Sequence, residues 1–149
     1  MRHFDTGHPC IVLGMYETGL AVGRSLGRKG MKVIGVDWKR DIGFRSRYVK
    51  PFLCPHPLKD PKAFLEFMMG LRRSSSHKPV LFLTADEFVI AVSRMREQLA
   101  DRYLFNIPSG ELIECIMNKD CLYLKAQDAG IPVPKTVKLD TLEDLEKAR

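Results

Sequence analysis

The sequence lacks every long apolar run that would carry it across a membrane. No uninterrupted hydrophobic stretch among its 149 residues is long enough to cross a bilayer. Residues 1–7 carry Arg2 and His3 but no apolar core of the kind found in a secretory signal peptide. We therefore expect a cytoplasmic protein with no membrane partner.

Cysteine is scarce, and its spacing excludes the common zinc sites. Cys10, Cys54, Cys115 and Cys121 form no C-x-x-C pair, so we expect no zinc knuckle and assign no metal ligand. Cys10 and Cys54 lie in or beside apolar, strand-like runs. Both are expected to be buried, reduced thiols.

The standard glycine-rich nucleotide motifs are also missing. Gly14 and Gly19 frame a short loop, with Gly23 further on, but the spacing is not G-x-G-x-x-G and no G-K-[ST] follows. Asp37 ends the second apolar run, about twenty residues on, where a ribose-binding acid would sit. A Rossmann-like module that binds a nucleotide or dinucleotide without catalysis therefore stays an alternative.

The positive charge has no pattern typical of nucleic-acid binding. The formal net charge is +6, and the basic residues are scattered apart from the stretch 39–50 and the pair Arg72 and Arg73. No aromatic residues alternate with a basic tract, as single-strand binders require. We expect no nucleic-acid partner, and steep salt dependence of DNA or RNA binding would show otherwise.

What the sequence does contain is a regular alternation of strand-like and helix-like segments. Apolar runs predict strands, of which 79–83 is the clearest central one. The run 49–54 is short or at an edge, because it contains Pro51 and is followed by Pro55. Amphipathic stretches predict helices near 20–29, 60–71, 86–99, 109–117 and 119–129. This alternation predicts an α/β fold, a three-layer open parallel sheet with helices on both faces.

The last part of the chain is expected to begin a second domain. A short strand is predicted at 103–107, and Asp60 and Ser109 are candidate N-caps of the helices that follow them. Thr141 opens a capping-box pattern for a further helix. We expect one domain over residues 1–117 and the truncated start of a second over 118–149.

Two loops follow predicted strands at the carboxyl end of the sheet, where open α/β folds bind ligands. The first begins at Gly14 and leads into a helix, for which Thr18 could serve as N-cap. The second holds Thr84, Asp86 and Glu87, and its two acids could bind an ammonium group or a metal. Alternatively, Thr84 or Asp86 caps the next helix.

The segment 118–134 resembles the entry to the nucleotide-binding region of ATP-grasp enzymes. Lys119 opens a helix that ends in Ala-Gly and is followed by Ile-Pro-Val-Pro, although Asn118 stands where the family has an acid. Residues 19–30, 33–37, 45–48 and 86–87 resemble the N-terminal domain, called pre-ATP-grasp, of the carbamoyl-phosphate-synthase-like and amino-acid-ligase branches. The resemblance thus covers nearly the whole chain.

This resemblance implies a ligase that uses ATP and Mg²⁺ to phosphorylate a carboxylate, after which an amine displaces phosphate from the acyl phosphate. Lys119 would contact the nucleotide phosphates. The catalytic residues and metal ligands would lie in later domains, so none is assigned here. The substrate-side candidates are Gly14, Tyr16, Glu17, Thr18, Gly19, Asp37, Asp86 and Glu87.

The implied partners are a small carboxylate and an amine, and a homodimer is left open. We expect this part of the enzyme neither to hydrolyse ATP nor to bind it tightly. In the full-length enzyme, Glu17→Gln is expected to raise the acceptor KM with little effect on ATP binding.

Overall fold

A parallel sheet organises the first part of the chain. The computed structural model describes residues 7–71 and 77–134, and its sheet has the order β3-β2-β1-β4. The strands are β1 (Cys10–Leu13), β2 (Val33–Asp37), β3 (Val49–Leu53) and β4 (Val80–Leu83). Each pairs in parallel with its neighbour, and Cys10 aligns with Val33 on one side and Val80 on the other. The predicted parallel α/β sheet is confirmed.

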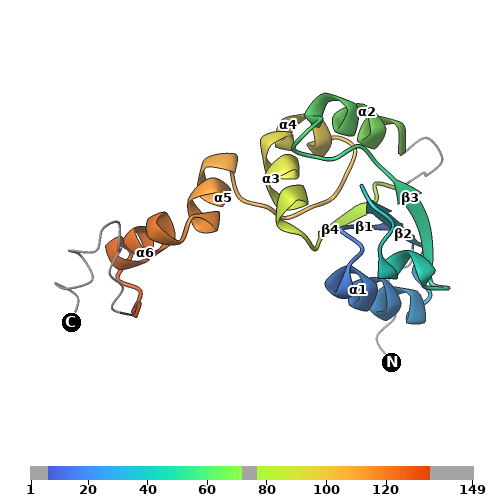
Figure 1. Ribbon diagram of the computed structural model, residues 1–149, viewed down its shortest axis with the longest axis horizontal. Coiled ribbons are helices and arrows are strands. Elements are labelled where there is room, and N and C mark those ends of the chain that lie inside the picture. The colour runs from blue at the N-terminus through green and yellow to red at the C-terminus, as the bar shows by residue number, and fades with distance from the viewer. Residues whose placement is uncertain (1–6, 72–76, 135–149) are drawn as a thin grey trace. The chain divides into compact units, whose positions relative to one another are not determined.

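Successive side chains along each strand point to opposite faces of the sheet, so they pack into two separate hydrophobic cores. Ile11 and Leu13 of β1 join one buried cluster, whereas Cys10 and Val12 join the other. Helix α1 (Glu17–Arg28) covers the second cluster. The first is covered by α2 (Pro61–Leu71), α3 (Asp86–Arg94) and α4 (Arg96–Ala100), on the opposite side of the sheet in Figure 1. The predicted three-layer arrangement is confirmed.

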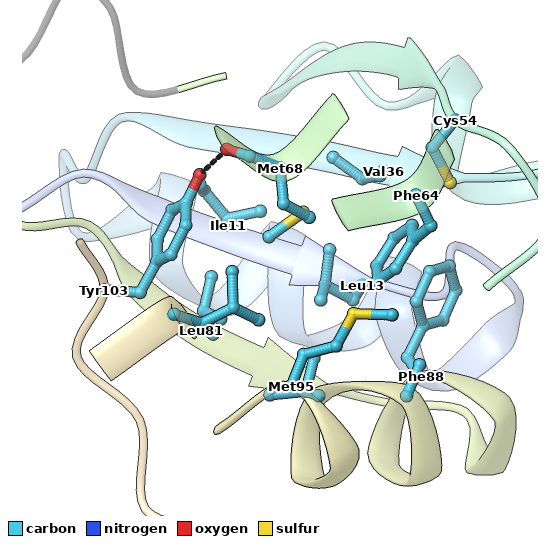
Figure 2. Close-up of a cluster of buried hydrophobic side chains, with 13 residues drawn as sticks. Ile11, Leu13, Val36, Cys54, Phe64, Met68, Leu81, Phe88, Met95 and Tyr103 are labelled. Atoms are coloured by element: carbon cyan, nitrogen blue, oxygen red, sulfur yellow. Dashed lines mark hydrogen bonds between the residues drawn. The ribbon is translucent and has the colours of Figure 1, made fainter. Parts of the chain in front are cut away.

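The larger core is rich in aromatic and sulfur-containing side chains. Figure 2 shows Phe64 and Met68 of α2 packed with Phe88 of α3 around the strands. Tyr103 reaches into this core and its hydroxyl donates a hydrogen bond to the Met68 carbonyl, which satisfies the one polar atom of the ring. Truncating a buried phenylalanine here would cost about 3–5 kcal/mol.

The strand predictions need two corrections. Strand β3 lies at an edge, as its prolines predicted. Strand β4 is not central, because within the described part of the chain it pairs fully with β1 alone. On its other side there is a single parallel bridge, Val80 to Leu104, in place of the strand predicted at 103–107. Tyr103 and Ile107 are buried, so the apolar pattern that suggested a strand reflects packing.

The helix starts also differ from expectation. Helix α1 begins at Glu17, so Thr18 lies in its first turn and Tyr16 occupies the cap position without a side-chain hydrogen bond. Ala85 precedes α3 in the same way, so neither Thr84 nor Asp86 is a cap. The single helix predicted near 86–99 is divided at Met95 into α3 and α4.

The Asp60 cap is confirmed, because its carboxylate accepts a hydrogen bond from the Ala63 N–H at 3.1 Å. A short 3₁₀ helix, η1 (Ile42–Arg45), lies between β2 and β3. None of the helices in residues 7–71 and 77–134 is long and apolar enough to span a membrane.

The chain divides into two compact units after Gly110. The second contains most of α5 (Gly110–Met117) and all of α6 (Lys119–Asp128), which the Asn118 side chain caps by accepting from the N–H groups of Asp120 and Cys121. A disulfide joins Cys115 to Cys121, which the sequence did not predict. The domain limit at 117 stays a prediction, and the Thr141 pattern lies outside the described residues.

Candidate functional site

The carboxyl ends of β1 and β4 lie side by side, with Leu13 aligned with Leu83. The strand order reverses between these two strands, since the chain runs outward from β1 to β3 and then returns to the other side of β1. At such a switch point the two loops leave the sheet toward opposite faces, which is where open α/β sheets bind ligands. Helix α1 begins just after β1 and α3 just after β4, so two helix N-termini meet this edge.

Gly14 shapes the turn after β1. It has a φ of 95°, a left-handed conformation that glycine adopts without penalty. A Cβ at this position would lie 2.9 Å from the Ala85 Cβ and 3.0 Å from the Thr84 Oγ1. The turn after β1 therefore touches the turn after β4, and a side chain at residue 14 would separate them.

Gly19 brings the first turn of α1 against the same loop. A Cβ here would lie 1.9 Å from the Gly14 carbonyl oxygen, which is backbone and cannot rotate away. Both glycines predicted as site residues are therefore required by close packing of the loop.

Thr84 joins the two loops from the β4 side. Its N–H donates to the Leu13 carbonyl at 2.9 Å, and its hydroxyl lies 3.0 Å from that oxygen and 2.6 Å from the Gly14 carbonyl oxygen. The Thr84 hydroxyl thus provides a hydrogen-bond donor for the Gly14 carbonyl, just beyond the last pair of residues aligned between β1 and β4. Sequence reasoning considered Thr84 only as a helix cap and missed this role.

Asp37 supports the loop from beneath. It is only 2% exposed, and its carboxylate accepts a hydrogen bond from the Met15 N–H at 2.6 Å and a longer one from Lys39 N–H at 3.4 Å. The Met15 carbonyl in turn accepts from the Gly43 N–H at 2.8 Å. Asp37 therefore faces into the protein, where it positions the loop; direct contact with a substrate stays a prediction. Sequence reasoning missed Met15 and Gly43.

The outer rim of the edge is acidic. Tyr16, Glu17 and Thr18 are exposed, as is Asp86, while Glu87 is half-buried. Glu17 lies in the first turn of α1, and Asp86 and Glu87 lie in the first turn of α3. Carboxylates at these positions are stabilised by the helix dipole and offset its attraction for anions. This rim is therefore better suited to an ammonium group than to a phosphate.

One cation approaches the rim from the loop after β2. The Lys39 ammonium lies 5.9 Å from the centre of the Tyr16 ring and 3.4 Å from an Asp41 carboxylate oxygen. The pairing with Asp41 reduces the positive charge that Lys39 presents to a ligand. Lys39 was not among the predicted site residues.

Lys119 belongs to the second unit, where it opens α6 with an exposed side chain. The Asn118 cap fixes the start of this helix, so the Asn118-Lys119 pair has a local structural purpose. Contact between Lys119 and nucleotide phosphates stays a prediction.

The free cysteines are buried, as predicted, and are poor nucleophiles. Burial raises the pKa of Cys54 to about 12, with a further contribution from the negative charge of Asp37. Burial also raises the pKa of Cys10. Among the residues that the structure describes, no group of three or more His, Cys, Asp or Glu side chains could hold a metal ion.

Among known proteins, similarity to this chain is found in solved structures and not in sequences. No protein-family model matches the sequence, and no curated protein matches it. The N5-carboxyaminoimidazole ribonucleotide synthetase from Thermotoga maritima shares the fold with a TM-score of 0.64 at 17% identity. An ADP complex of an N5-carboxyaminoimidazole ribonucleotide synthetase gives a TM-score of 0.63 at 15% identity.

Both alignments cover 95% of this chain but only 36% and 34% of the synthetase chains, so the chain spans about a third of their length. The matching region is the N-terminal part of the synthetase, which has the Rossmann-like pre-ATP-grasp fold. The predicted fold is thereby confirmed.

Proposed function

We propose that this chain is the substrate-side domain of an ATP-dependent carboxylate–amine ligase of the ATP-grasp type. The synthetases that share its fold are ATP-grasp enzymes, and one was solved with ADP. The resemblance of residues 118–134 to the entry of an ATP-grasp nucleotide region supports the same conclusion from a separate part of the chain. In such enzymes ATP phosphorylates a carboxylate and an amine then displaces phosphate from the acyl phosphate.

The observation that carries the proposal is the acidic rim at the switch point. Glu17 and Asp86 stand at the starts of two helices whose strands are adjacent, and both are exposed. There they can accept hydrogen bonds from a substrate ammonium group and orient it, and such positioning contributes to the rate of a bimolecular step. The loop that carries Glu17 is fixed by Asp37, Thr84 and Gly14.

Bound Mg²⁺ would neutralise phosphate charge during transfer. The described residues offer no cluster of ligands for it, so we assign no metal contact to them. Lys119 is the residue of this chain that we propose for the phosphates, by a charge-assisted hydrogen bond from its ammonium group.

The alternative, a dinucleotide-binding module, fits the geometry less well. A ribose-binding acid must present its carboxylate to the ligand, but that of Asp37 is buried against the Met15 N–H. A pyrophosphate at the start of α1 would also meet Glu17 in the first turn. Both features favour an amine over a dinucleotide at this edge.

A thermal-shift screen separates the two functions. We expect amino acids to raise the Tm of the chain through the acidic rim, and NAD, NADP and ATP to produce no shift that Glu17→Gln changes, because the rim repels phosphates. The response to amino acids should weaken in Glu17→Gln and persist in Glu66→Gln, which removes the same charge from an exposed position on α2. A clear stabilisation by NAD that Glu17→Gln strengthens would support the dinucleotide module, because that module places the pyrophosphate beside residue 17.

Calorimetry tests the second part of the proposal. Titration of the chain with Mg-ATP should show no micromolar binding, since the adenine pocket and metal ligands of the family lie in later domains. Micromolar affinity would contradict this. We further propose small carboxylate and amine partners, no nucleic-acid partner and a cytoplasmic location. The Cys115–Cys121 disulfide is an argument against the cytoplasmic location, because disulfides are rare in the cytosol.

A further inference from the structure

Arginines gather at the end of α1 that is remote from the candidate site. Arg24 and Arg28 come from the last two turns of the helix, Arg45 is the last residue of η1, and Arg47 lies between η1 and β3. Together with Ser46 and Tyr48 they line an open cleft of about 420 Å³. No acidic side chain from residues 7–71 or 77–134 lines this arginine cleft.

A glycine in α1 builds the cleft. A Cβ at Gly27 would lie 2.5 Å from the Tyr48 Cβ, so the absence of a side chain at residue 27 is what lets the tyrosine rest on the helix. The Arg47 guanidinium donates to the Tyr48 hydroxyl at 2.9 Å and lies 4.9 Å from the ring centre. Arg28 also acts on this hydroxyl, since its positive charge contributes to a lowered pKa of Tyr48.

The electrostatics of the cleft are strongly positive. The hydrogen bond from Arg47 lowers the pKa of Tyr48, and Arg28 lowers it further. Arg24 and Arg28 are four residues apart on one helix, where like charges repel each other. No ion pair within the described part of the chain neutralises any of the four arginines.

We propose that the arginine cleft binds a small phosphate-bearing anion, at a site separate from the acidic rim. Guanidinium groups form paired hydrogen bonds with phosphate oxygens, and the four arginines here line a space large enough for a phosphate or diphosphate. The carbonyl end of α1 repels anions, so binding would depend on the arginine side chains rather than on the backbone. Among the residues that the structure describes, Tyr48 is the only aromatic one lining the cleft, which gives no row of stacking platforms for a nucleic-acid strand.

Calorimetric titration of the whole chain with inorganic pyrophosphate, near physiological ionic strength, tests this site. Arg24→Gln/Arg28→Gln should weaken binding by about tenfold or more, which corresponds to about 1.4 kcal/mol. Lys59→Gln/Lys62→Gln removes the same charge from two exposed positions, one before α2 and one in its first turn, and should change affinity by less than about twofold. If the first double variant does not fold by circular dichroism, Arg45→Gln/Arg47→Gln replaces it.

Three results would overturn the proposal. The first is equal loss in the arginine and lysine variants, which would mean attraction to net charge alone. The second is retention of affinity in the arginine variants and its loss in Lys119→Ala, which would place the phosphate in the nucleotide region. The third is binding of an RNA oligonucleotide far more tightly than pyrophosphate, with a steep salt dependence. Binding of ATP that is tighter than that of pyrophosphate but weaker than micromolar, and that is lost in the arginine variants, would support the site and identify a nucleotide as the source of the phosphate.

Discussion

Replacing Asp37 with asparagine removes the negative charge beneath the candidate site while keeping the size of the side chain. One carboxylate oxygen accepts from the Met15 N–H at 2.6 Å and the other from the Lys39 N–H at 3.4 Å. An asparagine has only one acceptor oxygen. If that oxygen faces Met15, the amide NH₂ must face the Lys39 N–H, and two donors meet.

The expected magnitude follows from these two bonds. Hydrogen bonds to charged groups contribute about 1.5–3 kcal/mol and neutral ones about 0.5–1.5 kcal/mol, so Asp37→Asn should lower the free energy of unfolding by about 1–2 kcal/mol. Asp37→Ala also leaves the buried Met15 N–H without a partner and should cost about 3 kcal/mol. Urea unfolding at neutral pH measures both values. Asp101→Asn, an exposed acid after α4, serves as the control and should change stability by less than about 0.5 kcal/mol.

Cys54 supplies a second readout of the same charge. Its raised pKa rests first on burial and then on the charge of Asp37. Asp37→Asn should therefore lower the pKa of Cys54 while leaving it above its ordinary value, because the burial remains. The rate of iodoacetamide alkylation as a function of pH, located by peptide mass spectrometry, follows this change. Unaltered stability together with an unaltered Cys54 profile would refute the assignment of Asp37 as the support of the loop.

Two further predictions concern the same part of the sheet. Gly14→Ala must place a Cβ 2.9 Å from the Ala85 Cβ at a φ of 95°, so it should lower the free energy of unfolding by about 1–3 kcal/mol, whereas Gly70→Ala, where a Cβ meets nothing within 4 Å, should be neutral or stabilising. Equal stability of both variants in urea would contradict the close contact of the two loops. The loss of stability at alkaline pH should depend in part on Cys54, whose pKa is raised from 9.0 to about 12 in the folded protein. The folded state therefore holds the thiol proton more tightly than the unfolded state. This contribution to the free energy of unfolding is complete below pH 9.0 and is lost as the pH rises from there to about 12. Cys54→Ser should flatten the loss between these pH values in denaturant titrations, and an unchanged slope would count against it.

The layers of the fold were predictable because they depend on local patterns. Apolar runs of strand length, separated by amphipathic segments, are sufficient to indicate a parallel sheet between helices. The order of the strands was not predictable at this level, which is why 79–83 was expected in the centre of the sheet. The apolar sequence of a buried strand is the same whether the strand has two full partners or, like β4, one partner and a single bridge.

The candidate site was predicted in position but not in detail. The switch point and its exposed residues follow from which loops leave the carboxyl ends of the strands. The Thr84 hydroxyl contacts Gly14 from 70 positions away, and no local pattern indicates such a bond. The inward orientation of Asp37 likewise depends on the Met15 N–H, 22 positions before it. The Cys115–Cys121 bond has no motif in the sequence, because its spacing matches no common framework.

Amide chemical shifts of the chain during titration with an amino acid test most directly whether the acidic rim receives an amine. We expect the changes to be confined to residues 15–19 and 84–87, and to weaken in Glu17→Gln but not in Glu66→Gln. Changes confined to other parts of the first unit, or the same changes in Glu17→Gln as in the unaltered chain, would contradict the proposed amine site.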